Sequence, residues 1–414
     1  MAGVISRGIQ GPIIREGDDI VDIVVKSVYA SEQADGYTLQ NRDVIAVTES
    51  VVARAQGNYV TVDQVAQDIR AKFPAKKLGL VFPILSRNRF SMCLKAIARA
   101  MDEVVVLFSY PNDEVGNPLM VRSAYLKNRY SGVYDFEEAD FVKTFGSPVH
   151  PFTGVNYLDF YREVIESEGA KATFLFSNDC RYIASYCDSI LCCDIHTRNE
   201  TRDVLQSMGK QVLTLADIMN APVDGSGYHE SYGMLGSNKA NEEKLKLFPR
   251  NCQPVVEGIQ ARIKAERGLD VEVMVYGDGA FKDPVGGIWE LADPVVSPAY
   301  TAGLAGKPNE LKLKFLADND FADLSGEALQ EAIRQEIRAK REDLVGDMSS
   351  EGTTPRQYTD LLGSLCDLTS GSGDKGTPFI VIQNYLTTTR GEGSSPPCPG
   401  GSMPPGLFLS PGPL

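Results

Sequence analysis

The sequence predicts a mixed α/β fold in which a parallel-sheet segment interrupts a second α/β region. Two observations lead to this prediction. Between residues 58 and 228, short strands that are apolar throughout alternate with helices, a pattern typical of βαβ units. The flanking segments, 1–57 and 229–385, mix helices and strands without that regular alternation. With 43% hydrophobic and 23% charged residues, the 414-residue chain has enough apolar side chains to build sizeable cores.

The first 57 residues predict one helix and one strand. Asp18 or Asp19 is placed to cap a helix that begins at Ile20 and runs through Val28. The segment 43–47 is apolar after its first residue and predicts a buried strand. This stretch is therefore expected to be one α/β piece.

Residues 58–228 predict an inserted, Rossmann-like α/β domain. Thr61 and Gln64 form a capping box at the start of a helix that ends near Phe73. Because both faces of a parallel sheet are covered, its strands are expected to be apolar throughout. The expected strands are 77–81, 104–108, 172–176, 190–194 and 211–214, and the expected helices are 89–101, one near residue 182, and 198–208.

The segment 229–385 predicts a second mixed region, and the segment 386–414 predicts a disordered tail. The end of the chain is rich in Pro and Gly and has too few apolar residues to bury a core. In the mixed region, helices are expected at 239–247, 254–267, 326–341 and 359–368, and strands at 271–276, 311–315 and 379–382.

Composition excludes several classes of protein. The net charge of −14 argues against non-specific binding of nucleic acid, which requires a basic surface. The chain has no run of about 18 apolar residues, so no transmembrane helix is expected. The N-terminus has no apolar signal core, so a cytoplasmic protein is expected, with its eight cysteines mostly buried as reduced thiols. The chain contains no Cys-x-x-Cys pair, so the sequence gives no support for a structural zinc site.

The first candidate for binding is the segment 49–57, directly after a predicted strand. Neither a Walker A sequence nor a G-x-G-x-x-G between a strand and a helix is present, so the standard nucleotide motifs do not apply. The hydroxyl of Ser50 and the cation of Arg54 lie just past a strand end, where they can hold a phosphate. A solvated helix start explains the same residues equally well.

Two loops are further candidates. Gly277 and Gly279 allow a ligand to approach the backbone, and Asp278 between them is placed to bind Mg²⁺ or Mn²⁺. The alternative is an Asx-turn, which needs no metal. The polar loop 369–378 predicts either an anion-binding nest of backbone N–H groups or a plain surface turn. The acidic group at 318–320 can add a metal ligand or cap a helix.

These segments, in this order, resemble the coenzyme F420-0:gamma-glutamyl ligase family. The similarity covers roughly residues 9–57 and 229–385, so 1–57 and 229–385 are expected to form a ligase-like core interrupted by the inserted domain. The matching segments are 11–19, 43–57, 233–238, 273–279 and 373–378.

The resemblance implies an enzyme that uses GTP (or ATP) with Mn²⁺ or Mg²⁺ to activate a carboxylate as an acyl phosphate, which an amine such as that of glutamate then attacks. It also implies small-molecule substrates and a homodimer. The nucleotide contacts that it implies are Gly11, Pro12, Ile13, Ile14, Glu49, Ser50, Arg54, Asn238, Gly277, Gly279 and Gly373. The metal ligands that it implies are Asp278 and Asp374.

The sequence departs from the family pattern at several positions. In the matching segment 233–238, the family has a metal-binding Asp where this chain has Leu235. A Glu of the family's glycine loop falls near Gly371. Arg54 replaces a lysine and offers planar, bidentate geometry to a phosphate. Residues 58–228 replace a much shorter connection. The alternatives to a ligase are therefore a non-catalytic nucleotide- or metabolite-binding protein, and a metal-dependent phosphate hydrolase.

Overall fold

A computed structural model of the chain describes residues 3–128, 134–151, 153–277, 293–350, 356–370 and 375–386. The described residues form two compact units. One contains the described residues up to 308 together with 356–386, and the other contains residues 309–350. Helices combined with mixed and parallel sheets confirm the predicted α/β class.

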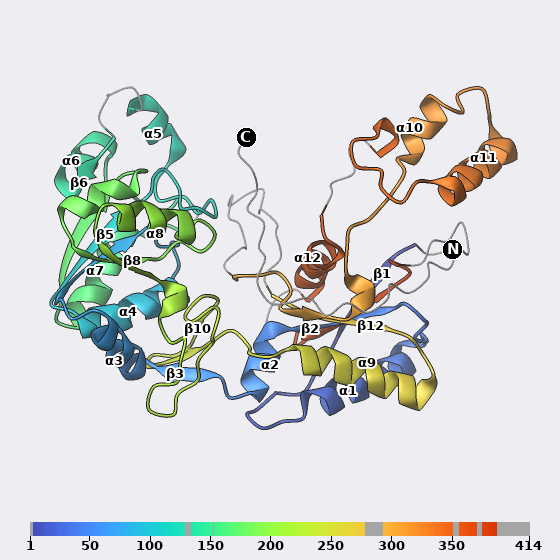
Figure 1. The fold of residues 1–414 in the computed structure, drawn as a ribbon, viewed down its shortest axis with the longest axis horizontal. Coiled ribbons are helices and arrows are strands. Elements are labelled where there is room, and N and C mark those ends of the chain that lie inside the picture. The colour runs from blue at the N-terminus through green and yellow to red at the C-terminus, as the bar shows by residue number, and fades with distance from the viewer. Residues whose placement is uncertain are drawn as a thin grey trace. The chain divides into compact units, whose positions relative to one another are not determined.

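The first sheet joins strands from both ends of the described chain (Figure 1). β2 and β12 are parallel, and the other neighbouring pairs are antiparallel. The strands expected at 43–47, 271–276 and 379–382 are thereby confirmed, whereas the edge strands β1 and β13 were not expected. The order is β1 (Ile5–Ile9), β14 (Phe379–Gln383), β2 (Val44–Thr48), β12 (Glu272–Tyr276) and β13 (Ala299–Tyr300).

Helices cover both faces of this sheet (Figure 1). Ile45 and Val47 of β2 pack on one side, and Val44 and Ala46 pack on the other. Since alternate residues of a strand point to opposite faces, a strand covered on both faces must be apolar throughout. Of the two expected caps, Asp18 and Asp19, it is Asp19 that caps the first helix, by accepting a hydrogen bond from the backbone N–H three residues later. The first face carries α1 (Ile20–Asp35) and α9 (Gln253–Arg267), and the second carries α12 (Tyr358–Ser370).

A six-stranded sheet is built from strands that all lie between β2 and β12 in the chain. Five of its strands are parallel, as predicted, and β6 at one edge is antiparallel. The order is β6 (Phe136–Glu137), β7 (Lys171–Phe176), β5 (Glu103–Phe108), β4 (Lys77–Val81), β8 (Ser189–Cys192) and β9 (Gln211–Thr214). The domain limits expected after residues 57, 228 and 385 stay predictions.

Both faces of the six-stranded sheet are covered (Figure 1). The capping box of Thr61 and Gln64 is present, and the helices expected at 89–101 and 198–208 are confirmed. A short 3₁₀ helix, Cys180–Ser185, forms near residue 182, and α5, α6 and α7 were not expected. The α-helices are α3 (Val62–Lys72), α4 (Phe90–Ala100), α5 (Arg122–Asn128), α6 (Glu138–Phe145), α7 (Tyr157–Ser167) and α8 (Arg198–Ser207).

A three-stranded sheet corrects one prediction. The segment 239–247, expected to be helical, is a hairpin of β10 (Asn238–Asn241) and β11 (Lys244–Lys246), and β11 pairs with β3 (Tyr59–Thr61). Leu245 in β11 and Leu247 just after it are both fully buried in the core that includes Val60. A spacing of two residues places side chains on one side of a strand, not of a helix.

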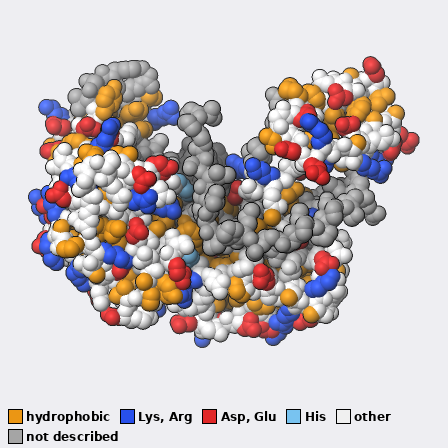
Figure 2. All heavy atoms as spheres, in the orientation of Figure 1, with side chains coloured by type: hydrophobic (Ala, Val, Ile, Leu, Met, Phe, Trp, Pro, Cys, Tyr) orange, Lys and Arg blue, Asp and Glu red, His pale blue; other side chains and the backbone are white. Residues whose placement is uncertain are grey.

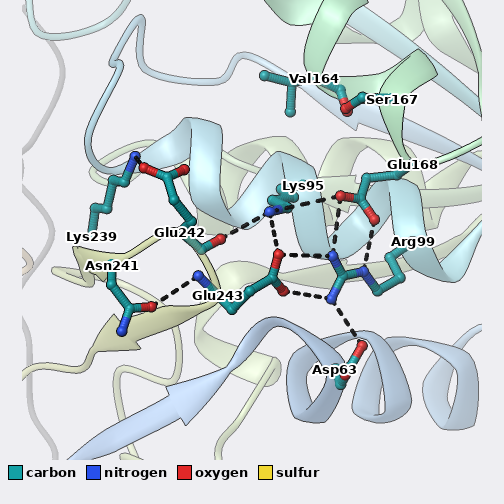
Figure 3. A network of polar contacts seen from close by, with 10 residues as sticks. All are labelled: Asp63, Lys95, Arg99, Val164, Ser167, Glu168, Lys239, Asn241, Glu242 and Glu243. Atoms are coloured by element: carbon teal, nitrogen blue, oxygen red, sulfur yellow. Dashed lines mark hydrogen bonds and ion pairs between the residues drawn. The ribbon is translucent and has the colours of Figure 1, made fainter.

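Charged side chains attach this hairpin to three helices (Figure 3). Arg99 of α4 binds the Glu243 carboxylate in the hairpin turn at 2.7 Å, Asp63 of α3 at 2.9 Å, and Glu168 after α7 at 2.7 Å. Lys95, one turn earlier on α4, binds the same Glu243 at 2.5 Å. The two cations therefore fix the hairpin against the helices that cover the sheet.

The second compact unit corrects another prediction. The segment 311–315, expected to be a strand, begins α10 (Leu313–Asp318), whereas α11 (Gly326–Ala339) confirms the expected helix. A strand needs a partner, and the described residues of this unit contain no other strand. Leu316 is the buried residue of α10. The acidic group at 318–320 lies at the end of α10, and no metal-binding cluster forms there among the described residues.

Three further observations concern the composition. Among the described residues, no helix is both long and apolar enough to cross a membrane. The seven cysteines that the structure describes are free thiols, and all but Cys180 are buried, as expected. On the face drawn in Figure 2, Lys and Arg side chains are interspersed with Asp and Glu.

Candidate functional site

A cavity of about 410 Å³ lies at the carboxyl ends of β2 and β12. Several predicted site residues line it although they come from distant parts of the sequence. The carboxyl ends of parallel strands meet at one edge of a sheet, which is where ligands bind in α/β folds. The lining residues are Gly11, Pro12, Ile13, Ile14, Thr48, Ser50, Val51, Arg54, Tyr276, Ser370, Gly376, Thr377 and Pro378.

Backbone pairing brings these segments together. Thr48 and Tyr276 are the last residues of β2 and β12 and lie opposite each other in the parallel register. The N–H of Thr48 donates to the carbonyl of Pro378 at 3.0 Å, and the N–H of Gly11 donates to the carbonyl of Gly376 at 3.0 Å. A side chain at Gly11 would place its Cβ 2.8 Å from the Phe379 ring, so glycine permits this close packing.

Arg54 and Ser50 supply polar groups from α2 (Glu49–Ala55), the helix that follows β2 directly. The Nε of Arg54 donates to the carbonyl of Ile14 at 3.2 Å, which anchors the side chain at the cavity. Its terminal nitrogens form no hydrogen bond with the described residues. Arg54 is an exposed residue, so these donors can bind an anion.

Tyr276 adds a polar group that the sequence did not single out. Tyr276 is 2% exposed, and the hydroxyls of Ser370 and Thr48 lie close to its buried phenol hydroxyl. Burial raises the pKa of this phenol above its usual value, so the hydroxyl stays protonated at neutral pH. Thr48 was also missed, because only the tertiary structure shows that its segment meets the others, whereas Thr377 belongs to the predicted loop 369–378.

Glu49 lies behind the cavity rather than in its lining. Its carboxylate is buried and binds the ammonium group of Lys246 on β11 at 2.7 and 2.8 Å. Burial raises the pKa of Glu49 above its usual value, and the positive charge of Lys246 opposes that shift. Lys246 belongs to the segment for which the sequence predicted a helix, so this ion pair was not foreseen.

Two other predicted contacts also lie away from the cavity lining. Asn238 is half-buried on β10, opposite Lys246 in the hairpin register. Gly277 follows β12, and a Cβ there would stand 2.5 Å from the Oδ2 of Asp293. Asp293 is itself buried and pairs with Arg89 at 2.9 Å. The group that approaches the Gly277 backbone is therefore a carboxylate of the protein.

Leu235 occupies an apolar environment. It is 1% exposed and lines a cavity of about 30 Å³ together with Ile84, Phe90 and Met234. Arg89 and Ser237 also line this cavity, and the Ser237 hydroxyl contacts the Cys93 thiol at 3.6 Å. The residue that stands where the resembled family has a carboxylate is thus part of a core.

The predicted metal ligands Asp278 and Asp374 lie outside the described residues, as do Gly279, Gly371 and Gly373. In the part of the chain that the structure describes, no group of three or more His, Cys, Asp or Glu side chains is arranged to hold a metal ion. The prediction that these two aspartates bind a metal stays a prediction.

Comparison with known proteins gives one finding. A model of the family described as F420-0:Gamma-glutamyl ligase matches residues 8–384. No curated protein matches the chain. The family match spans every segment that lines the cavity, and it also spans the six-stranded sheet.

Proposed function

We propose a function for this chain from the family to which it belongs, the F420-0:gamma-glutamyl ligase family. The chain is proposed to be a nucleotide-dependent ligase that forms a gamma-glutamyl-type amide bond. The family match supports ligase chemistry on small-molecule substrates. The observation that carries the nucleotide part of the proposal is the cavity, where Gly11–Ile14, Ser50 and Arg54 meet from separate segments.

The chemistry of the cavity suits GTP or ATP. Its volume of about 410 Å³ is within the range of small-molecule sites. Arg54 offers planar donors for a phosphate, and Ser50 offers a hydroxyl. Ile13 is 80% exposed beside Pro12, so the rim has an apolar surface on which a flat base can pack. The cation, the hydroxyl and the apolar rim together make the cavity fit a nucleotide better than it fits a simple anion.

The proposed reaction has two steps. An oxygen of the acceptor carboxylate attacks the γ-phosphorus, the bond to the nucleoside diphosphate breaks, and an acyl phosphate forms. The amine of glutamate then attacks the acyl carbon, loses a proton, and releases inorganic phosphate as the amide forms. Arg54 balances negative charge on the phosphates in the first step, the kind of electrostatic stabilisation that accelerates such transfers.

A divalent cation, Mn²⁺ or Mg²⁺, would supply positive charge that neutralises the charge developing on the phosphates. The candidates to hold it are Asp278 and Asp374, which lie outside the described residues. Because the described residues provide no complete ligand set, no step is assigned to the metal.

Calorimetric titration of GTP and ATP tests the nucleotide site. We expect Arg54→Met to weaken binding about tenfold or more, as the loss of a charge-assisted hydrogen bond predicts. Arg334→Met is the matched control, because Arg334 is an exposed arginine of α11 whose side chain forms its only hydrogen bond to a described residue with Glu331. Equal affinities in wild type and Arg54→Met would contradict the assignment.

Release of phosphate distinguishes the chemical alternatives. Wild type is incubated with nucleotide and Mn²⁺, with and without glutamate and candidate carboxylates. Release that depends on glutamate supports the ligase, release without it supports a phosphate hydrolase, and binding without release supports a non-catalytic binding protein.

A homodimer is part of the proposal, because the resemblance implies one. Light scattering at micromolar concentration is expected to give twice the mass of one chain. A monomer mass would contradict this part and leave the proposed chemistry unaffected.

A further inference from the structure

Four buried or nearly buried charges form two adjoining ion pairs behind the cavity. In the first, Lys246 binds both carboxylate oxygens of Glu49, and the side chains are 7% and 6% exposed. In the second, Arg89 binds Asp293, and the side chains are 19% and 1% exposed. Both Asp293 and Arg89 act electrostatically on Glu49, so the two pairs are neighbours.

The Lys246–Glu49 pair connects the hairpin to the cavity. Glu49 is the first residue of α2, and the next residue, Ser50, lines the cavity. Thr48, which precedes Glu49, also lines it, and so does Arg54 in the last turn of the same helix. Lys246 lies on β11, whose neighbours are β10 and β3.

We propose that Lys246 is a positioning residue: it holds α2 through Glu49 and thereby places Ser50 and Arg54 at the cavity. Neither Lys246 nor Glu49 lines the cavity, so the effect passes through the helix and not through contact with a ligand. The link to nucleotide binding rests on the proposed function.

The physical reason is the cost of an unpaired buried charge. A carboxylate removed from water is stabilised here by a cation that contacts both of its oxygens. Without Lys246, the Glu49 carboxylate must turn toward solvent or take up a proton, and either change removes the bond that holds the start of α2. An apolar pair of similar length avoids this cost, since neither side chain then carries a charge.

The test uses hydrogen–deuterium exchange of the α2 amides in the ligand-free protein, followed by titration of GTP. In Lys246→Met we expect these amides to exchange at least tenfold faster and GTP to bind at least tenfold more weakly. Lys239→Met is the matched control, because Lys239 lies on the same hairpin and pairs with the exposed Glu242. The double variant Glu49→Met/Lys246→Met is expected to restore both slow exchange and affinity.

The outcomes separate the possible roles. Unchanged α2 exchange in Lys246→Met relative to Lys239→Met would overturn the proposal. The proposal would also be overturned if the double variant regains slow exchange of the α2 amides but not its affinity for GTP. Glu49 or Lys246 would then contact the ligand. If Lys246→Met fails to fold, the double variant decides between these roles. If wild type binds neither GTP nor ATP, the proposed function fails, and the exchange data still decide whether Lys246 holds α2.

Discussion

At Gly277, the absence of a side chain lets two elements pack closely. A Cβ there would stand 2.5 Å from the Oδ2 of Asp293, and Asp293 cannot swing aside without breaking its ion pair with Arg89. We expect Gly277→Ala to lower the free energy of unfolding by about 1–3 kcal/mol, as overpacking of a buried site does. Urea denaturation measures this. Gly3→Ala, whose added Cβ would contact nothing, is the control, and equal losses in both variants would contradict the prediction.

Asp278, the next residue, lies outside the described residues, and its role as a metal ligand is a prediction from the sequence. Asp278→Asn keeps the shape and the capacity to form an Asx-turn but removes the charge that a hard cation requires. We expect this variant to fold and to lose the part of nucleotide affinity that depends on Mn²⁺. Titration with and without Mn²⁺ measures it, and unchanged metal dependence would refute the assignment.

At the scale of elements, the hairpin of β10 and β11 is tied to α3, α4 and α7 by the charges in Figure 3. Arg99 and Lys95 hold the pKa of Glu243 down at about 2, against its ordinary value of 4.5. Because the folded-state pKa is depressed, the stabilising effect of the Glu243 carboxylate is complete above about pH 4.5 and is lost as the pH falls toward 2.

Glu243→Gln tests this link. We expect the variant to be less stable than wild type by about 1 kcal/mol at pH 7, because the carboxylate is 55% exposed and solvent screens the pair. The difference should shrink between pH 4.5 and 2. Thermal or urea unfolding across this range measures it, with Glu242→Gln as the control for a glutamate in the same turn. A difference between wild type and Glu243→Gln that does not change with pH would show that the charge is not responsible.

At the scale of the whole molecule, the sequence predicts that the Pro- and Gly-rich end contributes nothing to stability. Residues 391–414 lie outside the described residues. They contain few apolar side chains with which to dock, so we expect a chain truncated at residue 390 to keep its melting temperature to within a few degrees. Scanning calorimetry of the two chains measures this, and a larger fall would show that the tail packs on the folded units.

The sequence alone determined the features that depend on neighbouring residues. The cap at Asp19 and the capping box of Thr61 and Gln64 form between residues three apart, so their pattern is visible in the chain. The parallel sheet was predictable for a related reason, since strands covered on both faces must be apolar throughout. For the site, the resemblance to the ligase family implied Gly11–Ile14, Ser50 and Arg54, and the structure brings these residues together around one cavity.

Only the tertiary structure decided the features that depend on distant partners. The hairpin at 238–246 needs β3 and a buried position for Leu245, neither of which appears in the local pattern. Glu49 is buried behind the cavity because Lys246, far along the chain, neutralises it. Tyr276 lies at the cavity because β12 aligns with β2. Local propensity describes one segment at a time, whereas burial and charge pairing are properties of segments in contact, so these outcomes became visible only when the chain was folded.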